Sequence, residues 1–247
     1  MEPFYVQHFK INDMVVDRFG RLKPSMLLLM AQSVATQHGE QLSVGYDILS
    51  RKRMFWAVIR HRVQITRMPH HGETIRLETW PMPPTRSSYP RSVIAYDEAG
   101  NECFRAISLW VLMDIDKRSM VLPGKSGICL EGSVRGNELA RPGSLTPKPL
   151  RSHRSRSVCF SDLDRNGHMN NTKYLEWADD LLPSDFHRNH SLKEMTICYL
   201  SEAWEGQELD LYWDFLEDGA MQMDARRRNG EKEDRVFSAR FQFDSNP

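Results

Sequence analysis

An internal repeat constrains the fold of this chain more than any other feature of the sequence. Residues 16–27, V-D-R-F-G-R-L-K-P-S-M-L, align without a gap with residues 163–174, L-D-R-N-G-H-M-N-N-T-K-Y. Each copy runs into apolar side chains with the i, i+3, i+4, i+7 spacing of one helix face, in the same register. Shared register makes duplication a better explanation than chance, so we predict two copies of one structural unit.

Both halves predict the same order of elements after the repeat. We expect the first helix to end near Gly39, which suits a C-terminal cap, and the second to end before Pro183. Turn residues such as Gly72 and Gly206 separate strand-like segments. These segments are 55–66, 73–79, 92–96 and 104–114 in the first half, and 194–200, 208–215, 221–227 and 236–244 in the second. The predicted fold class is α+β, with an antiparallel sheet wrapped around one long helix in each half.

The segment between the halves has a different composition. Residues 123–150 contain four prolines and five glycines and show no clear periodicity. Such a long structureless connection is uncommon inside one compact domain. We therefore predict an N-terminal unit at 1–122, a linker at 123–150 and a C-terminal unit at 151–247.

Composition excludes several classes of protein. The 33 basic and 33 acidic side chains give a formal net charge of zero, so no global field favours nucleic acid or a membrane. The basic clusters 51–53, 151–156 and 226–228 are the candidates for local attraction to an acidic partner. The four cysteines form no C-x-x-C pair, and the N-terminal residues show neither the basic nor the apolar region of a secretion signal. We expect a cytoplasmic protein without stable membrane association.

The second copy of the repeat carries a set of reactive side chains that the first copy lacks. Asp164, Asn166 and His168 stand at alternate positions, whereas the first copy has Phe19 and Arg21 in place of Asn166 and His168. If the segment is extended, the three side chains lie on one face of the backbone. A carboxylate, an amide and an imidazole can together orient a substrate and move a proton at neutral pH. The pattern therefore predicts a hydrolytic site.

Three structural interpretations compete with this hypothesis. The segment opens like a calcium-binding loop at Asp162, but Lys173 occupies the twelfth position, where such a loop needs a glutamate. Asn170 and its neighbours are also typical of a helix cap, and a single histidine is often part of a protein core. Without further information, catalytic and structural roles are equally supported, and no metal is expected.

Residues 162–177, D-L-D-R-N-G-H-M-N-N-T-K-Y-L-E-W, resemble the acyl-acyl carrier protein thioesterases, whose pattern is D-L-D-x-N-x-H-x-N-N-x-x-Y-x-x-W. The resemblance is strong in the second half; the first half agrees through length, duplicated architecture and an apolar helix. It implies two tandem hotdog units, each a long helix wrapped by an antiparallel sheet. It also implies hydrolysis of the thioester that joins a fatty acyl chain to its carrier protein, with no cofactor.

The resemblance also implies the site residues. The catalytic groups of the family fall on Asp164, Asn166, His168 and Glu202. Many plant members have a cysteine after this glutamate, but here the position is Ala203, which excludes that nucleophile. The first unit is expected to supply the acyl pocket, and its candidate substrate-binding residues are Met26, Leu29, Met30 and Trp56.

The resemblance leaves several functions open. Hydrolysis of acyl-coenzyme A, hydration or dehydration of an acyl thioester, and acyl binding without catalysis all fit the same architecture. Acyl carrier proteins of this class are acidic, which gives the basic clusters a use in docking. Nucleic acid is not an expected partner. Whether the tandem chain also forms a homodimer stays open, because two units can satisfy the pairing that single hotdog units achieve by dimerising.

Overall fold

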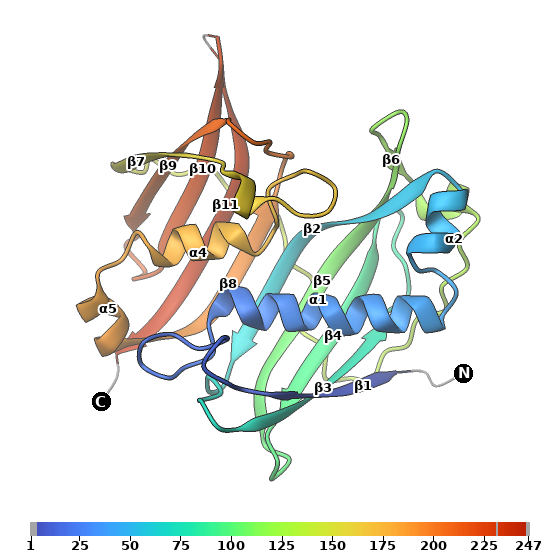
Figure 1. The fold of residues 1–247 in the computed structure, drawn as a ribbon, viewed down its shortest axis with the longest axis horizontal. Helices are drawn as coiled ribbons and strands as arrows, with labels where there is room; N and C mark the ends of the chain where they lie inside the picture. Colours follow the sequence, from blue (N-terminus) through green and yellow to red (C-terminus); the bar gives the residue numbers. More distant parts are fainter. Residues whose placement is uncertain (1–3, 231, 246–247) are drawn as a thin grey trace. The chain divides into compact units, whose positions relative to one another are not determined.

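The computed structural model describes residues 4–230 and 232–245, and the chain divides into two compact units between Pro142 and Gly143 (Figure 1). Each unit is considered by itself. The first contains β1 (Tyr5–Lys10), α1 (Pro24–Gln41), α2 (Tyr46–Arg51), β2 (Met54–Ile65), β3 (Thr74–Pro81), β4 (Tyr89–Tyr96), β5 (Glu102–Asp114), β6 (Met120–Val121) and α3 (Pro123–Ser126). The second contains β7 (Ser152–Ser157), a 3-10 turn (Phe160–Asp162), α4 (Lys173–Asp179), α5 (Ser184–Asn189), β8 (His190–Tyr199), β9 (Glu208–Phe215), β10 (Met221–Asn229) and β11 (Lys232–Ser245).

The two sheets have the same topology. In the first unit the strand order is β1-β3-β4-β5-β2, with β6 added to β5, and in the second it is β7-β9-β10-β11-β8. Neighbouring strands within each of these sheets run antiparallel. The predicted strands are confirmed, with ends that differ by a few residues. The strand that follows each helix pairs with the last strand of its unit, so the sheet is not a simple meander.

Helix α1 forms the core of the first unit together with the sheet. Pro24 occupies its first turn, where the missing amide hydrogen costs nothing because first-turn amides have no partner within the helix. The helix passes through the predicted cap at Gly39 and ends at Gln41, since Glu40 and Gln41 are good helix formers. Its fully buried side chains include Leu27, Leu28 and Val34.

The second unit differs from the prediction in its helix. Helix α4 has 7 residues whereas α1 has 18, so the expectation of one long helix per unit is wrong for the second unit. Pro183 disfavours a helical conformation at Leu182, and α5 begins only after this break. Tyr174 of α4 stacks on Phe237 of β11, with ring centroids 4.5 Å apart, and this contact anchors α4 on its sheet. None of the helices in the described residues is both long and apolar enough to cross a membrane.

The segment predicted as a linker packs on both units. Glu138 accepts a hydrogen bond from Trp80 Nε1 at 3.2 Å, and Leu139 packs against the cluster around Trp80. Past the division of the chain, the carbonyl oxygens of Leu145 and Thr146 accept hydrogen bonds from the second sheet. Backbone polar groups thus find partners on the sheets, which explains how a segment without helix or strand periodicity remains ordered.

Buried His61 on β2 gives the first unit a defined response to acid. The residue is 1% exposed, and burial lowers the pKa of its imidazole from 6.5 to about 3. Below pH 6.5 the unfolded chain binds a proton at this site that the folded chain does not, so stability falls as the pH decreases. In the wild-type protein this site lowers the free energy of unfolding by about 2 kcal/mol between pH 6.5 and 5, and we expect His61→Asn to abolish this decrease. Chemical unfolding at several pH values measures it, with half-exposed His71→Asn as the control. An unchanged pH slope in His61→Asn would contradict the assignment.

Candidate active site

The segment that carries the predicted site forms a tight turn. Leu163 and Met169 pair as an isolated bridge, and the Asp164 amide donates a 2.8 Å hydrogen bond to the His168 carbonyl. Gly167 closes the turn at a φ of 79°, a value that favours glycine. The segment is therefore a turn and not an extended strand, so the condition under which alternate side chains would share one face is not met.

The Asp164 carboxylate holds this turn. Its Oδ1 accepts hydrogen bonds from the backbone amides of Asn166, at 2.7 Å, and His168, at 3.4 Å. Its Oδ2 lies 3.5 Å from the side-chain nitrogen of Asn166. An aspartate that bonds amides two and four residues ahead stabilises a turn without any substrate. This geometry gives Asp164 a structural task.

The first unit contains the same turn. Asp17 Oδ1 accepts hydrogen bonds from the amides of Phe19, at 2.8 Å, and Arg21, at 2.9 Å, and Gly20 has a φ of 76°. Arg21, in the place of His168, forms an ion pair with Asp17. The aspartate and the arginine after it recur in both turns, as Asp17-Arg18 and Asp164-Arg165, whereas Asn166 and His168 do not recur. Comparison of the two copies thus distinguishes Asp164, whose bonds stabilise the turn, from Asn166 and His168, which occur only in the second copy.

Glu202 meets His168 because the segment after β8 returns to the turn. The Met169 amide donates a 2.8 Å hydrogen bond to the carbonyl of Ala203, which fixes the neighbouring Glu202 beside the imidazole. Glu202 Oε2 lies 3.4 Å from His168 Nε2. The His168 side chain is 10% exposed and that of Glu202 is 40% exposed. A sheltered imidazole therefore faces a carboxylate that solvent can reach, the arrangement of a general acid–base pair. Asn166, two residues before His168 in the turn, is exposed.

Trp204 belongs to the site although the sequence did not single it out. Its ring meets that of His168 edge to face, with centroids 4.1 Å apart and planes at 88°. The contact fixes the position of the imidazole and shields it from water. The signal was present in the sequence: H-G-E at residues 71–73 and E-G-Q at 205–207 mark the same turn in each half. In the first turn the Glu73 side chain accepts a hydrogen bond from the His70 amide, and in the second the Gln207 side chain accepts one from the Trp204 amide.

Arg227 of β10 supports this segment from the sheet. Its Nη1 donates to the carbonyl oxygen of Glu202 at 3.1 Å and to Gln207 Oε1 at 3.3 Å. Gln207 Oε1 also accepts from the Trp204 amide at 3.1 Å. One guanidinium thus holds the backbone of the residue that supplies the carboxylate and, through Gln207, the residue that packs on His168. Nothing in the sequence connected Arg227 with the site, because the contact depends on strand register.

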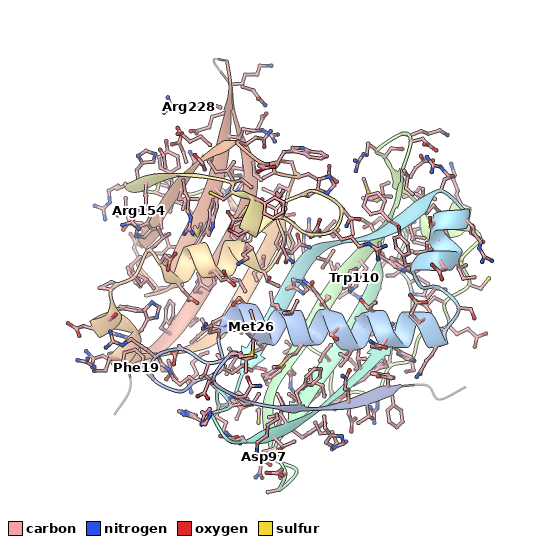
Figure 2. The ribbon with its side chains drawn as sticks, in the orientation of Figure 1. Phe19, Met26, Asp97, Trp110, Arg154 and Arg228 are labelled. Carbon is pink, nitrogen blue, oxygen red and sulfur yellow. The ribbon has the colours of Figure 1, made fainter. Side chains whose placement is uncertain are left out.

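The four residues predicted to bind substrate have different surroundings in the first unit. Met30 is 8% exposed. Met26, which Figure 2 labels, is half-buried in the first turn of α1. Leu29 is 43% exposed, so α1 is not buried on every side here. Trp56 donates its indole hydrogen to the Val44 carbonyl at 2.8 Å and packs in a cluster of buried residues at the β2–β5 pair. These contacts explain Trp56 as a core residue, while the two methionines remain candidates for a pocket.

The first residue of the calcium-loop pattern has a structural role. Residues 4–230 and 232–245 contain no group of three or more His, Cys, Asp or Glu side chains placed to hold a metal ion. Asp162, the first position of the calcium-loop pattern, is 6% exposed, and its Oδ2 accepts a hydrogen bond from the Cys159 amide. Its carboxylate is therefore part of the local backbone structure.

The two turns offer a matched test of the role of the aspartate. We expect Asp17→Ala and Asp164→Ala each to lower the free energy of unfolding by about 1–2 kcal/mol, as removal of a capping side chain does. Urea unfolding of the single variants measures the effect. Asp13→Ala, where the side chain is 94% exposed, is the control and should be nearly neutral. A neutral Asp164→Ala beside a destabilised Asp17→Ala would show that the second turn does not depend on its aspartate.

Comparisons with known proteins agree with the motif. The family model for the acyl-ACP thioesterase N-terminal domain matches residues 2–122, and that for the C-terminal domain matches residues 149–244. A palmitoyl-acyl carrier protein thioesterase of Gossypium hirsutum is 27% identical over 214 residues, which are 80% of this chain and 52% of that protein. An oleoyl-acyl carrier protein thioesterase of Arabidopsis thaliana is 24% identical over 237 residues, 85% of this chain and 61% of the relative. The chain thus spans about half to three fifths of the length of these curated relatives.

Solved structures share the fold along the whole chain. A thioesterase structure from Bacteroides thetaiotaomicron has a TM-score of 0.83 and 21% identity and covers 98% of both chains. The 12:0-ACP thioesterase from Umbellularia californica also has a TM-score of 0.83, with 20% identity, and covers 100% of this chain and 99% of its own. The predicted α+β fold of two tandem hotdog units is confirmed by these structures. Because the two family models together match most of its length, this chain belongs to the acyl-ACP thioesterase family.

Proposed function

We propose that this protein hydrolyses the thioester of a fatty acyl-acyl carrier protein and releases the free fatty acid. The observation that carries the proposal is the 3.4 Å approach of Glu202 Oε2 to the sheltered Nε2 of His168. The relatives from Gossypium and Arabidopsis are named as thioesterases for palmitoyl and oleoyl chains on acyl carrier protein. Their names support the reaction class but do not specify a chain length for this protein.

The proposed reaction needs a base, an acid and a binding group for the substrate. Glu202 accepts a proton from a water molecule, whose oxygen attacks the thioester carbonyl and forms a tetrahedral oxyanion. The C–S bond then breaks, and the departing thiolate takes its proton from His168, which receives the proton that Glu202 removed from water across the 3.4 Å separation, so that both side chains return to their starting states. The products are a fatty acid and the free thiol of the carrier. Solvent access at Glu202 suits delivery of water, and burial of His168 suits protection of the transferred proton.

Asn166 and Asp164 take different roles in this proposal. The exposed amide of Asn166 is available to hold the substrate or the attacking water, with its nitrogen only loosely joined to Asp164 at 3.5 Å. Asp164 acts as a positioning residue, because Asp17 makes the same backbone bonds in a turn that lacks His and Asn. The acyl chain is assigned to the first unit, where Met30 and Met26 are the favoured pocket residues because methionine adapts to irregular apolar ligands.

Carrier docking is proposed on basic surface, and ion pairs restrict the choice of surface. Within the 226–228 cluster, Arg226 pairs with Asp224 and Glu233, and Arg228 pairs with Asp210. Arg53 pairs with Asp116 and Arg156 with Asp180. Charges already compensated attract an acidic partner weakly. The remaining exposed cations at the C-terminal end of α2, Arg51 and Lys52, are the better docking candidates.

Single substitutions test the proposed catalytic pair and the substrate group. We expect Glu202→Gln, His168→Ala and Asn166→Ala to lower kcat for acyl-carrier protein by about 100-fold or more, because each removes a proton-transfer or binding group. Thiol release, followed with a thiol reagent, measures turnover, and circular dichroism checks folding. Glu205→Gln, an exposed glutamate in the same segment, is the control. If two of the three variants stay folded and near fully active, the site is wrong. Parallel assays with acyl-coenzyme A and an enoyl thioester separate the rival reactions.

Arg227 provides a test of the support around Glu202. We expect Arg227→Met to lower kcat by about tenfold with little change in KM. Loss of the two hydrogen bonds lets the Glu202 backbone move, and a displacement of about 1 Å is enough to slow a step that depends on the position of its carboxylate. Arg227→Lys should recover part of the activity, since an ammonium can still reach one acceptor. Arg228→Met, an exposed neighbour on the same strand, is the control. Equal activity of Arg227→Met and wild type would show that the strand does not position Glu202.

A further inference from the structure

The imidazole nitrogen that faces Glu202 is enclosed by the protein. His168 Nε2 is a buried atom, and Glu202 Oε2 lies 3.4 Å from it. In the proposed reaction, the departing sulfur has to come within hydrogen-bond reach of this nitrogen to take its proton. A thioester can therefore react only after one of the groups packed around the imidazole has moved aside.

Two side chains lie against the imidazole. The carboxylate of Glu202 faces Nε2, and the ring of Trp204 meets the imidazole edge to face, with centroids 4.1 Å apart. Glu202 has to stay beside His168, because the proton passes between them. Trp204 has no such task, and it is 39% exposed, so its indole has solvent into which it can rotate. Trp204 is therefore the group whose displacement opens His168 and leaves the proton path intact.

The backbone on both sides of Trp204 is held in place. His168 and Trp204 pair as an isolated bridge. The Met169 amide donates to the Ala203 carbonyl at 2.8 Å. Trp204 also donates its amide hydrogen to Gln207 Oε1 and accepts from the Gln207 amide, each at 3.1 Å. Movement of the segment would break these bonds, whereas rotation of the indole about its side-chain bonds breaks none of them. The structure thus favours a moving side chain on a fixed backbone.

Rotation of the indole has a free-energy cost that the substrate must offset. The edge-to-face contact with His168 is lost, and apolar surface of the ring becomes exposed. A long acyl chain on a carrier protein makes many contacts away from the reacting bond, and their binding energy can be used at the site. A short thioester of a small thiol makes few such contacts. Displacement of the indole thus discriminates between the two kinds of substrate, as an induced fit does.

We propose that Trp204 is a gate over His168 that selects thioesters by the contacts they make elsewhere on the protein. The selection rests on the proposed function, since a fatty acyl-carrier protein is the substrate that the gate admits. The cover itself rests on the burial of His168 Nε2 and on the ring contact, which do not depend on which thioester reacts.

Chemical modification measures the cover without any turnover. Diethyl pyrocarbonate acylates accessible imidazole nitrogens, and trypsin releases His168 in the peptide 166–173, N-G-H-M-N-N-T-K, in which it is the only histidine. We expect Trp204→Ala to speed modification of His168 by about tenfold, because the aromatic contact and the area that the indole covers are lost. Trp204→Phe should give an intermediate rate, since a phenyl ring keeps part of the cover. Leu200→Ala, exposed in the same segment, is the control, and half-exposed His71 reports the activity of the reagent in each sample.

Steady-state kinetics test the selection. We expect Trp204→Ala to raise kcat/KM for S-butanoyl-N-acetylcysteamine by about tenfold and to change that for hexadecanoyl-acyl carrier protein by less than about threefold. The preference for the carrier-bound substrate therefore falls. A purely positioning role of Trp204 gives a different result, in which both constants decrease together, because a misplaced imidazole serves neither substrate. Trp204→Phe should restore most of the wild-type preference.

The gate and the proposed function fail under different results. Equal modification of His168 in the wild type and in Trp204→Ala would overturn the gate. Faster modification in Glu202→Ala alone would also overturn it, because the carboxylate would then be the cover. A parallel decrease of both kcat/KM values in Trp204→Ala would overturn the selection. If the wild type hydrolysed neither thioester, the proposed function would fail, while the modification rates would still decide whether Trp204 covers His168.

Discussion

The hydrogen bonds from one aspartate to the amides of a tight turn determine how this protein presents its candidate site. Asp164 makes them at 2.7 and 3.4 Å, and Asp17 makes the same bonds at 2.8 and 2.9 Å in the first unit. The turn fixes the direction of the side chain at its end, which is His168 in one copy and Arg21 in the other. The same turn thus supports different side chains in the two units, because the aspartate bonds backbone amides and does not depend on the side chains of those residues.

The second requirement is that a segment distant in sequence returns to this turn. The backbone bond from Met169 to Ala203 places Glu202 beside His168, and Arg227 holds the same segment from β10. Trp204 then covers the imidazole. Four parts of the second unit, the turn, the segment after β8, the turn before β9 and a strand of the sheet, therefore contribute to one small site. Their convergence supplies the preorganisation that the proposed proton transfer requires.

Charge is arranged differently in the two units. Much of the basic surface predicted for docking is compensated by nearby carboxylates, as in the pair of Arg226 with Glu233. The first unit instead buries Arg91 next to neutral His38, where burial makes the charge costly. A sequence shows how many charged residues a chain has, but it cannot show which of them are neutralised, since pairs such as Arg151 and Asp214 are 63 residues apart.

Local pattern alone determined the duplication, the eight main strands, the presence of the first helix and the motif that contains Asp164, Asn166 and His168. These features depend on residues close in sequence, whose spacing records which faces are buried. The tertiary structure decided what spacing cannot encode: the tight turn that carries the motif, a helix of 7 residues instead of a long one, and the support of Glu202 by Arg227. Each depends on hydrogen bonds between segments whose register is set only when the sheet forms, because a slip of one residue would turn every side chain to the opposite face.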